Sequence, residues 1–220
     1  MNSRLTAPSR GEGKCDSPTM LPAVVFDLGK VLVDFDYSIA ARKIAARSAQ
    51  KSLLALHDFL STSPLLVDYE SGRISRNDFF EAVQGAIGFC GGLEEFSGYF
   101  ADIFTEMSAT VALHNELRLR GLSTYIFSNT IDLAVEHIRR NFPFFGNFDG
   151  YIFSYEVGWL KPQPEIYAAM EKLASRRGED LVYLDDRPEN VAAGAARGWR
   201  AILHVSPEKT RQTLAAMGIV

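Results

Sequence analysis

Five short apolar runs, rich in residues favoured in β-strands, constrain the fold of this chain more than any other feature. Amphipathic helical patterns separate the later runs. Ile131, Val135, Ile138 and Phe142, for example, recur at spacings of 4, 3 and 4 and form one apolar stripe. Near-continuous apolar strands that alternate with such helices are typical of a parallel sheet covered on both faces. The sequence therefore predicts an α/β core with strands at residues 23–26, 124–127, 151–153, 181–184 and 201–205.

One interval interrupts this alternation. Nearly a hundred residues separate the first predicted strand from the second, and they contain no convincing strand pattern. They carry apolar residues at helical spacing instead, in three groups: Leu53, Leu56 and Leu60; Phe79, Phe80, Val83 and Ile87 behind an N-cap at Ser75; and Leu93, Phe96, Phe100 and Phe104. A further helix at 109–120, ending at Gly121, leads back to the sheet. We therefore expect a flexible polar leader over 1–20, a core formed by 21–35 and 109–220, and an inserted helical subdomain over 36–108.

The composition excludes several classes of protein. The 220 residues carry a net charge of −4, so a basic surface for nucleic acid is not expected. No apolar run reaches the roughly 20 residues of a membrane-spanning helix, and the first residues lack the apolar segment of a secretory signal. The chain is predicted to be cytoplasmic, monomeric or homodimeric, with Cys15 and Cys90 as free thiols. The histidines have no ligand spacing, and we expect His114 and His137 at the surface of helices.

Polar side chains follow three of the predicted strands: Asp27 follows the first, Ser128 and Asn129 follow the second, and Asp185 and Asp186 follow the fourth. Ligands of an open parallel sheet bind at the carboxyl ends of its strands, so these groups are expected to line one crevice. Lys161 lies in the loop between the third and fourth strands, directly before Pro162. Because a following proline disfavours helical backbone, Lys161 is expected to project from a loop into the same crevice.

Four motifs occur in order along the chain: VVFDLGKVLVD at 24–34, FSNT at 127–130, KP at 161–162 and LDD at 184–186. Together they resemble the four ordered motifs of the haloacid dehalogenase superfamily, and the resemblance extends from about residue 21 to the end of the chain. It implies a Rossmann-like parallel sheet core with an inserted α-helical cap domain. The segment YESGRIS at 69–75 is similar to the loop that such caps send over the active site. Glu70 is therefore a candidate for substrate contact, as is Trp159.

The resemblance implies a hydrolase that uses a carboxylate as its nucleophile. Asp27 would attack phosphorus and form an aspartyl-phosphate, which divides one difficult hydrolysis into two easier steps. Ser128 and Asn129 would donate hydrogen bonds to the transferring phosphoryl group, and Lys161 would offset its charge. The expected substrate is a small phosphorylated metabolite.

The same resemblance implies a magnesium ion. Three carboxylates and an anionic substrate repel one another, so the site requires positive charge beyond that of Lys161. Mg²⁺ prefers oxygen ligands. Its expected ligands are Asp27, the backbone carbonyl of Gly29 and Asp186, with Asp185 assisting through water or Lys161.

Gly29 departs from the commonest phosphatase pattern, which has a second Asp two residues after the nucleophile. That Asp protonates the leaving oxygen, and general acid–base help is worth about 10²–10⁴ in rate. The branch of the superfamily with Asp-x-Gly at this motif includes sugar-phosphate phosphatases. The resemblance therefore favours a sugar 1-phosphate, whose C1 oxygen leaves readily. Asp34 or Asp36 could instead supply the acid, or phosphatase activity could be lost.

Two other functions stay open. A 2-haloacid dehalogenase of the same superfamily uses the Asp nucleophile without a metal, and the cation-binding pair Asp185 and Asp186 argues against it. If the lack of an acid at Gly29 abolishes catalysis, the protein would instead be a catalytically weak scaffold that binds phosphate. A phospho-receiver domain carries its acidic pair after the first strand and lacks a large cap, so the order of the motifs disfavours it.

Overall fold

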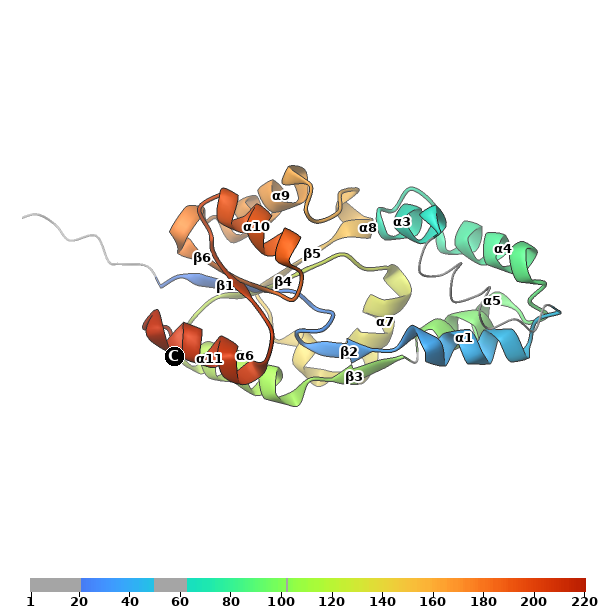
Figure 1. The fold of residues 1–220 in the computed structure, drawn as a ribbon, viewed down its shortest axis with the longest axis horizontal. Helices are drawn as coiled ribbons and strands as arrows, with labels where there is room; N and C mark the ends of the chain where they lie inside the picture. The colour runs from blue at the N-terminus through green and yellow to red at the C-terminus, as the bar shows by residue number, and fades with distance from the viewer. Residues whose placement is uncertain (1–20, 50–62, 102) are drawn as a thin grey trace, which may run out of the picture.

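The computed structural model describes residues 21–49, 63–101 and 103–220. Five parallel strands form one sheet in the order β5-β4-β1-β6-β7 (Figure 1). They are β1 (Ala23–Phe26), β4 (Thr124–Ser128), β5 (Gly150–Phe153), β6 (Leu181–Asp185) and β7 (Arg200–Leu203). The α/β fold with a parallel sheet and a helical insert is therefore confirmed, and the last strand ends at Leu203 rather than at residue 205.

Alternation along β1 explains how helices cover both faces of the sheet. Val24 and Phe26 pack in one apolar cluster with residues of α6 (Ser108–Leu119) and α11 (Pro207–Ala216). Val25 packs in another with residues of α9 (Pro164–Ala174) and α10 (Pro188–Ala196). Figure 1 shows these two pairs of helices on opposite sides of the strands. Successive side chains of a strand point to opposite faces of the sheet. Since helices cover both faces, all four residues of β1 are buried.

The apolar stripe predicted after the second core strand is confirmed. It belongs to α7 (Asp132–Asn141), on which Val135 and Ile138 are buried, with Ile131 buried at its N-cap and Phe142 partly buried at its end. The helix at 109–120 is α6, and Gly121 after it has φ +82°. Three short elements complete the core: η1 (Pro143–Gly146), α8 (Ser154–Val157) and η2 (Gly178–Asp180). No helix in the described ranges is long and apolar enough to cross a membrane.

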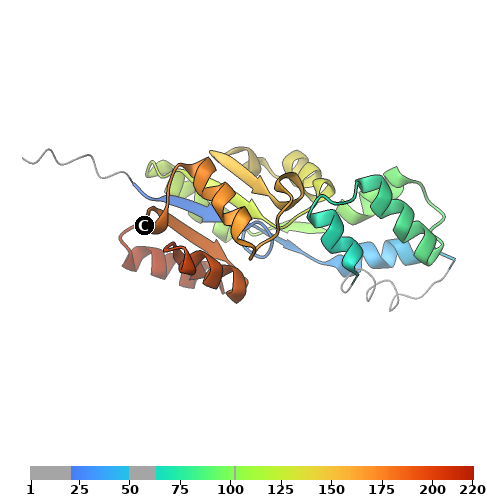
Figure 2. The same ribbon diagram turned by 90° about the horizontal axis from the view of Figure 1, so that it is seen from above.

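Helices of the insert gather at one end of the molecule (Figures 1 and 2). They are α1 (Tyr37–Ala46), α3 (Pro64–Glu70), α4 (Arg76–Ile87) and α5 (Leu93–Ala101). They share an apolar cluster of their own, which includes Ile44, Val83 and Phe96. The N-cap at Ser75 is confirmed, and Asp78 completes a capping box with it. The predicted helical pattern of Leu53, Leu56 and Leu60 and the predicted leader over 1–20 lie outside the described residues.

Two short strands in this interval correct the sequence interpretation, which found no strand between the first two core strands. β2 (Val33–Phe35) and β3 (Phe104–Glu106) form a two-stranded antiparallel sheet in which Phe35 pairs with Phe104. Phe104 was expected on a helix, but α5 ends at Ala101. Strands of three residues are too short to show a period of two, and their pairing joins segments far apart in the chain. Neither strand could therefore be recognised from local pattern.

His114 was expected at the surface but lies in the core. Its side chain is fully buried, stacks on Phe148 with ring centroids 4.0 Å apart, and shares a 3.1 Å hydrogen bond with Thr124. The spacing carried the signal, because His114 falls three residues after Val111 and three before Leu117, both buried on α6. Burial lowers the pKa of His114 to about 4.

This buried histidine predicts a loss of stability in acid. The unfolded chain binds a proton at His114 near pH 6.5, whereas the folded chain resists it until about pH 4. The contribution of neutral His114 to the free energy of unfolding is therefore fully present above pH 6.5 and is lost as the pH falls toward 4. We expect the difference in free energy of unfolding between the wild type and His114→Gln to decrease by about 3 kcal/mol from pH 7 to pH 4. Urea denaturation at several pH values measures it, and parallel curves would contradict the prediction.

Candidate active site

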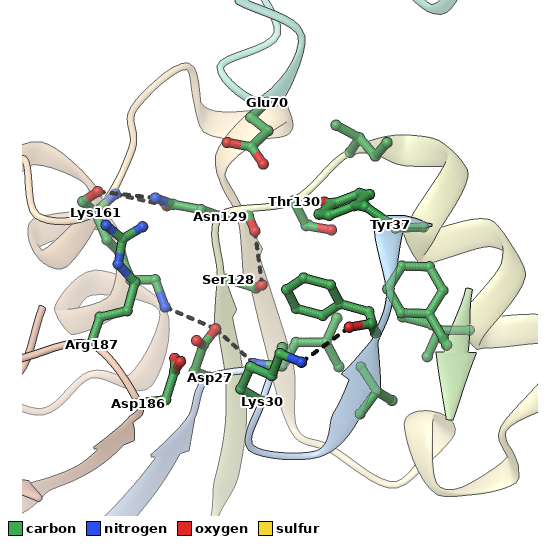
Figure 3. A pocket seen from close by; sticks show the side chains of 18 of the residues that line it. Asp27, Lys30, Tyr37, Glu70, Ser128, Asn129, Thr130, Lys161, Asp186 and Arg187 are labelled. Carbon is green, nitrogen blue, oxygen red and sulfur yellow. Dashed lines mark hydrogen bonds and ion pairs between the residues drawn. The ribbon is translucent and has the colours of Figure 1, made fainter. Parts of the chain in front are cut away.

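The carboxyl edge of the sheet contains a cavity of about 400 Å³. β1 lies between β4 and β6 in register, so the polar residues after these strands meet at one edge (Figure 3). Seven of the residues predicted from the sequence line the cavity: Asp27, Gly29, Glu70, Ser128, Asn129, Lys161 and Asp186. The eighth, Asp185, is fully buried directly behind it. The structure therefore brings these eight residues together.

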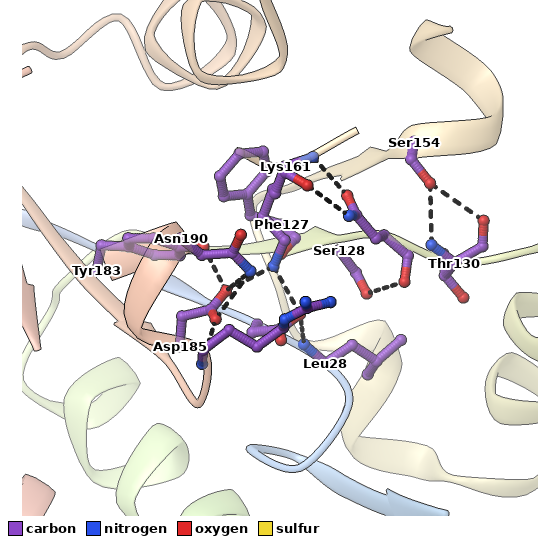
Figure 4. Close-up of polar contacts among 12 residues, drawn as sticks. Leu28, Phe127, Ser128, Thr130, Ser154, Lys161, Tyr183, Asp185 and Asn190 are labelled. Atoms are coloured by element: carbon purple, nitrogen blue, oxygen red, sulfur yellow. Dashed lines mark hydrogen bonds and ion pairs between the residues drawn. The ribbon is translucent and has the colours of Figure 1, made fainter. Parts of the chain in front are cut away.

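Lys161 is a buried cation shared by two carboxylates. Its Nζ lies 2.9 Å from Asp27 Oδ1 and 2.7 Å from Asp185 Oδ2, and it donates a 2.9 Å hydrogen bond to the carbonyl of Phe127 (Figure 4). Burial by itself lowers the pKa of Lys161, but the charges of Asp27 and Asp185 outweigh burial and raise it above the ordinary value. Lys161 therefore stays charged.

Asp185 is held by more donors than any other residue described at this edge. Besides Lys161, its carboxylate accepts hydrogen bonds from the Tyr183 hydroxyl, from Arg187 N at 2.8 Å and from Asn190 Nδ2 at 3.0 Å. Burial opposes ionisation, yet the charge of Lys161 and these hydrogen bonds hold the pKa of Asp185 below its ordinary value. Asp185 is therefore an ionised anchor for Lys161.

Asp27 and Asp186 face the cavity beside this anchor. Burial raises the pKa of Asp27, which the nearby Lys161 only partly offsets, and burial together with the charge of Asp185 raises the pKa of Asp186. Ligand atoms of Asp27, Asp185 and Asp186 all lie within 4.8 Å of one another. A divalent cation favours the ionised form of such carboxylates, and hard oxygen donors are what Mg²⁺ prefers. The donor set therefore fits magnesium, as the sequence predicted.

Asn129 makes contacts that the sequence did not anticipate. Its Oδ1 accepts a 2.7 Å hydrogen bond from Lys161 N, and its Nδ2 donates a 3.0 Å hydrogen bond to Lys161 O. Ser128 Oγ donates to the carbonyl of Asn129 at 3.3 Å. The Asn129 amide thus holds the main chain of Lys161, while Ser128 lines the cavity with a hydroxyl that rotates freely enough to find another acceptor.

Glu70 enters the cavity from the end of α3, above the other site residues in Figure 3. Burial raises the pKa of Glu70 to about 7, and the charge of Arg187 only partly opposes this. Trp159, the other candidate for substrate contact, is 44% exposed and is not among the lining residues. Its segment faces solvent instead.

Phe35 occupies the space that an acidic side chain at position 29 would need. A Cβ added to Gly29 would lie 2.8 Å from Phe35 Cε1, well inside van der Waals contact. The two alternative acids are elsewhere. Asp34 is exposed and paired with Lys30, and Asp36 accepts a 2.8 Å hydrogen bond from Ser38 N as the N-cap of α1. Neither lines the cavity.

Sequence reasoning missed several residues of the site: Phe35, Tyr37, Leu66, Phe104, Thr130, Tyr183 and Asn190. Asn190 carried a usable signal, since it lies on the first turn of α10 directly after the acidic pair. The aromatic residues carried none, because nothing in their local pattern distinguishes a cavity wall from a core position.

The shared Lys161 predicts a large and pH-dependent effect of removing its charge. Breaking a buried ion pair costs about 3–5 kcal/mol, because the remaining charges lose their partner. We expect Lys161→Met to lose that much free energy of unfolding at pH 7.5 without magnesium. The loss should become smaller toward pH 5. Without Lys161 the pKa values of Asp27 and Asp185 rise, so these carboxyl groups take up protons and lose their unpaired charge as the pH falls.

Urea denaturation measures this effect, and Lys172→Met, which alters an exposed lysine on α9, is the matched control. Equal stability of the two variants would contradict the role of Lys161.

Comparison with known proteins places this site in a family. The family model of haloacid dehalogenase-like hydrolases matches residues 21–198. A D-ribitol-5-phosphate phosphatase from Bacteroides thetaiotaomicron is 25% identical over 205 residues, which cover 89% of this chain and 97% of that protein. A sesquiterpene phosphatase from Aspergillus oryzae is 25% identical over 183 residues, which cover 82% and 88% respectively.

Solved structures show the same fold. A haloacid dehalogenase family enzyme from Bacteroides thetaiotaomicron, in complex with magnesium and inorganic phosphate, has a TM-score of 0.72 at 20% identity and covers 84% of this chain and 94% of its own. The L-2-haloacid dehalogenase of Xanthobacter autotrophicus has a TM-score of 0.60 at 18% identity, with 91% and 85% covered. Since the family model spans most of the sequence, the chain belongs to the haloacid dehalogenase-like hydrolases.

Proposed function

We propose that the protein is a Mg²⁺-dependent phosphatase that hydrolyses a small phosphate monoester through an aspartyl-phosphate at Asp27. The observation that carries this proposal is the group of three carboxylates within 4.8 Å beside a buried lysine. Attack at the carbon of a 2-haloacid develops no charge on a phosphoryl group and has no need of a cation site next to the nucleophile, whereas attack on a dianionic phosphate does. The two relatives described above, each named as a phosphatase, support the same reaction.

Asp27 is oriented for attack by contacts on one of its two oxygens. Oδ1 accepts a 2.7 Å hydrogen bond from Leu28 N and faces Lys161 Nζ at 2.9 Å. We assign Oδ2 as the nucleophile that forms the bond to phosphorus while the ester oxygen departs with its electron pair. Water then attacks the aspartyl-phosphate, which releases inorganic phosphate and restores Asp27.

The remaining residues position the phosphoryl group and balance its charge. Ser128 is assigned to donate a hydrogen bond to a phosphoryl oxygen, and Lys161 to offset negative charge. Asn129 contributes by holding the Lys161 main chain. Asp27, Asp186 and the carbonyl of Gly29 would hold Mg²⁺, with Asp185 acting through Lys161; when bound, the ion supplies positive charge next to the reacting group.

The helical insert, 36–108, is proposed to act as a cap that excludes water from this site. Asp132 on α7 ties it to the core, since Arg76 donates to Asp132 Oδ2 at 2.6 Å and the Tyr69 hydroxyl donates to Oδ1. Gly72 (φ +67°) permits a close approach, because a Cβ there would lie 2.3 Å from the carbonyl oxygen of Tyr155. These contacts bring Glu70 over the cavity.

The leaving group is proposed to depart without help from residue 29. Phe35 fills the space of the missing acid, so a substrate with a more acidic leaving oxygen is favoured. The C1 oxygen of a sugar 1-phosphate meets this requirement, and so does a phenolic oxygen. Leaving-group acidity alone does not distinguish these two.

The proposed function predicts how phosphate release responds to removal of magnesium and to loss of Asp27. Phosphate release from a panel of phosphate monoesters should require magnesium, stop with a chelator, and fall at least 10³-fold in Asp27→Asn because the nucleophile is lost. The chelator-treated enzyme should recover on addition of magnesium. Chelator-insensitive turnover, or chloride release from 2-chloropropionate, would favour a dehalogenase instead. A folded protein inactive on every ester would indicate a phosphate-binding scaffold.

Because Phe35 fills the space beside Gly29, removing its ring should allow an acid introduced at position 29 to raise kcat. In the Phe35→Ala background, Gly29→Asp should raise kcat for an alkyl phosphate at least tenfold, because the new carboxyl group has room to protonate the leaving oxygen. With 4-nitrophenyl phosphate, whose leaving group needs no proton, the gain should be absent. In the presence of Phe35 the same substitution should give less. Equal rates for Phe35→Ala and the double variant on alkyl phosphate would contradict this account.

A further inference from the structure

The cavity is divided by chemistry into two parts. The polar part, around Asp27, Lys161 and Asp186, has been described above. The other part is an apolar chamber lined by Phe35, Tyr37, Leu66, Phe104, Ile131 and Ala134. In Figure 3 Tyr37 lies on the opposite side of the cavity from Lys161 and Asp186. A molecule with its phosphate at Asp27 would therefore extend its organic part toward these side chains.

Four elements supply the wall of the chamber. Phe35 and Phe104 come from the paired strands β2 and β3, Tyr37 from α1 and Leu66 from α3. All four side chains are only half-buried, so they present apolar surface to the cavity. The Phe35 ring packs edge-on against Tyr37 at 5.2 Å and against Phe104 at 6.2 Å. The three aromatic side chains thus form one continuous surface, to which Leu66 adds an aliphatic side chain.

The two cations beside the chamber are already engaged with the protein. Lys30 is paired with Asp34, donates a 3.0 Å hydrogen bond to the carbonyl of Phe35 and lies 4.6 Å from the Phe35 ring centroid. Arg187 is paired with Glu189. Both cations therefore have partners within the protein rather than a row of substrate hydroxyls.

In the described part of the cap, Glu70 is the charged residue that lines the cavity. Its surroundings are also apolar. Leu66 and Glu70 are four residues apart on α3 and both line the cavity, whereas Val67 between them is 44% exposed. Burial raises the pKa of Glu70 to about 7, as expected of a carboxyl group in an apolar setting.

We propose that the substrate is the phosphate monoester of an apolar, hydrocarbon-rich alcohol or phenol, whose organic part occupies the chamber formed by Phe35, Tyr37, Leu66 and Phe104; a phenol also has the more acidic leaving oxygen favoured above. This inference rests on the proposed phosphatase function and deepens it. A polyol or sugar would turn its hydroxyls toward an aromatic wall and lose hydrogen bonds to water without replacement. A hydrocarbon group would instead gain from burial there.

A matched pair of esters tests the proposal. Pentyl phosphate and ribitol 5-phosphate have the same five-carbon chain and both release a primary alcohol, so they differ mainly in the hydroxyls. We expect kcat/KM for pentyl phosphate to exceed that for ribitol 5-phosphate at least tenfold. Along the series from ethyl to pentyl phosphate, kcat/KM should rise about three- to fourfold per buried methylene.

Variants on α3 connect this preference to the chamber. Leu66→Gln should reduce the ratio of kcat/KM for pentyl to ethyl phosphate at least fivefold. Val67→Gln, one residue away and directed to solvent, should leave the ratio unchanged. An unchanged ratio in Leu66→Gln would overturn the assignment of the chamber.

The outcomes separate this inference from the function on which it rests. Magnesium-dependent phosphate release with no dependence on chain length, or with ribitol 5-phosphate preferred to pentyl phosphate, would overturn the apolar substrate while the phosphatase stands. Absence of phosphate release from every ester, by wild-type protein that unfolds cooperatively in urea, would overturn both.

Discussion

The ion pairs of the buried Lys161 ammonium group are the interactions on which the arrangement of the sheet's carboxyl edge depends. The ammonium group lies within 3 Å of carboxylates that follow two adjacent strands, and it also donates to the carbonyl of Phe127 on a third. Asp27 and Asp185 could not both stay ionised in so buried a place without it. Because Asn129 holds the main chain of Lys161 on both sides, the loop and the three strands form one polar network.

The small β2–β3 sheet has a second structural role. It carries the chain out of the core and back, and it places Phe35 against Gly29 at the edge of the cavity. One aromatic ring thereby has two consequences. It removes the room for an acid next to the nucleophile, and it supplies part of the apolar wall on the far side of the site. The limited help to the leaving group that we propose and the apolar lining would both follow from this one packing arrangement.

The fold itself does not select the chemistry. Structures named as a magnesium- and phosphate-bound enzyme and as an L-2-haloacid dehalogenase share it with this chain. Function must therefore be argued from the site. The decisive feature here is the position of Asp186 beside Asp27 and Asp185, which creates a place for a divalent cation that carbon–halogen chemistry does not require.

The sequence by itself determined those features that depend on residues close together in the chain. The five strands, the stripe of α7, the N-cap at Ser75 and the polar residues at the strand ends were all readable, because strand and helix periodicity depend on near neighbours. The meeting of Asp27, Lys161 and Asp186 followed from the rule that parallel strands share one carboxyl edge.

Only the tertiary structure decided the rest. The pairing of Val33–Phe35 with Phe104–Glu106, the contact of Phe35 with Gly29, the attachment of Asn129 to Lys161 and the burial of His114 each join segments distant in the chain or depend on which way a side chain turns. An aromatic residue has the same local pattern whether it fills a core or lines a cavity. The apolar chamber therefore depends on the packing of the insert against α7 and α8 of the core, which no local pattern shows.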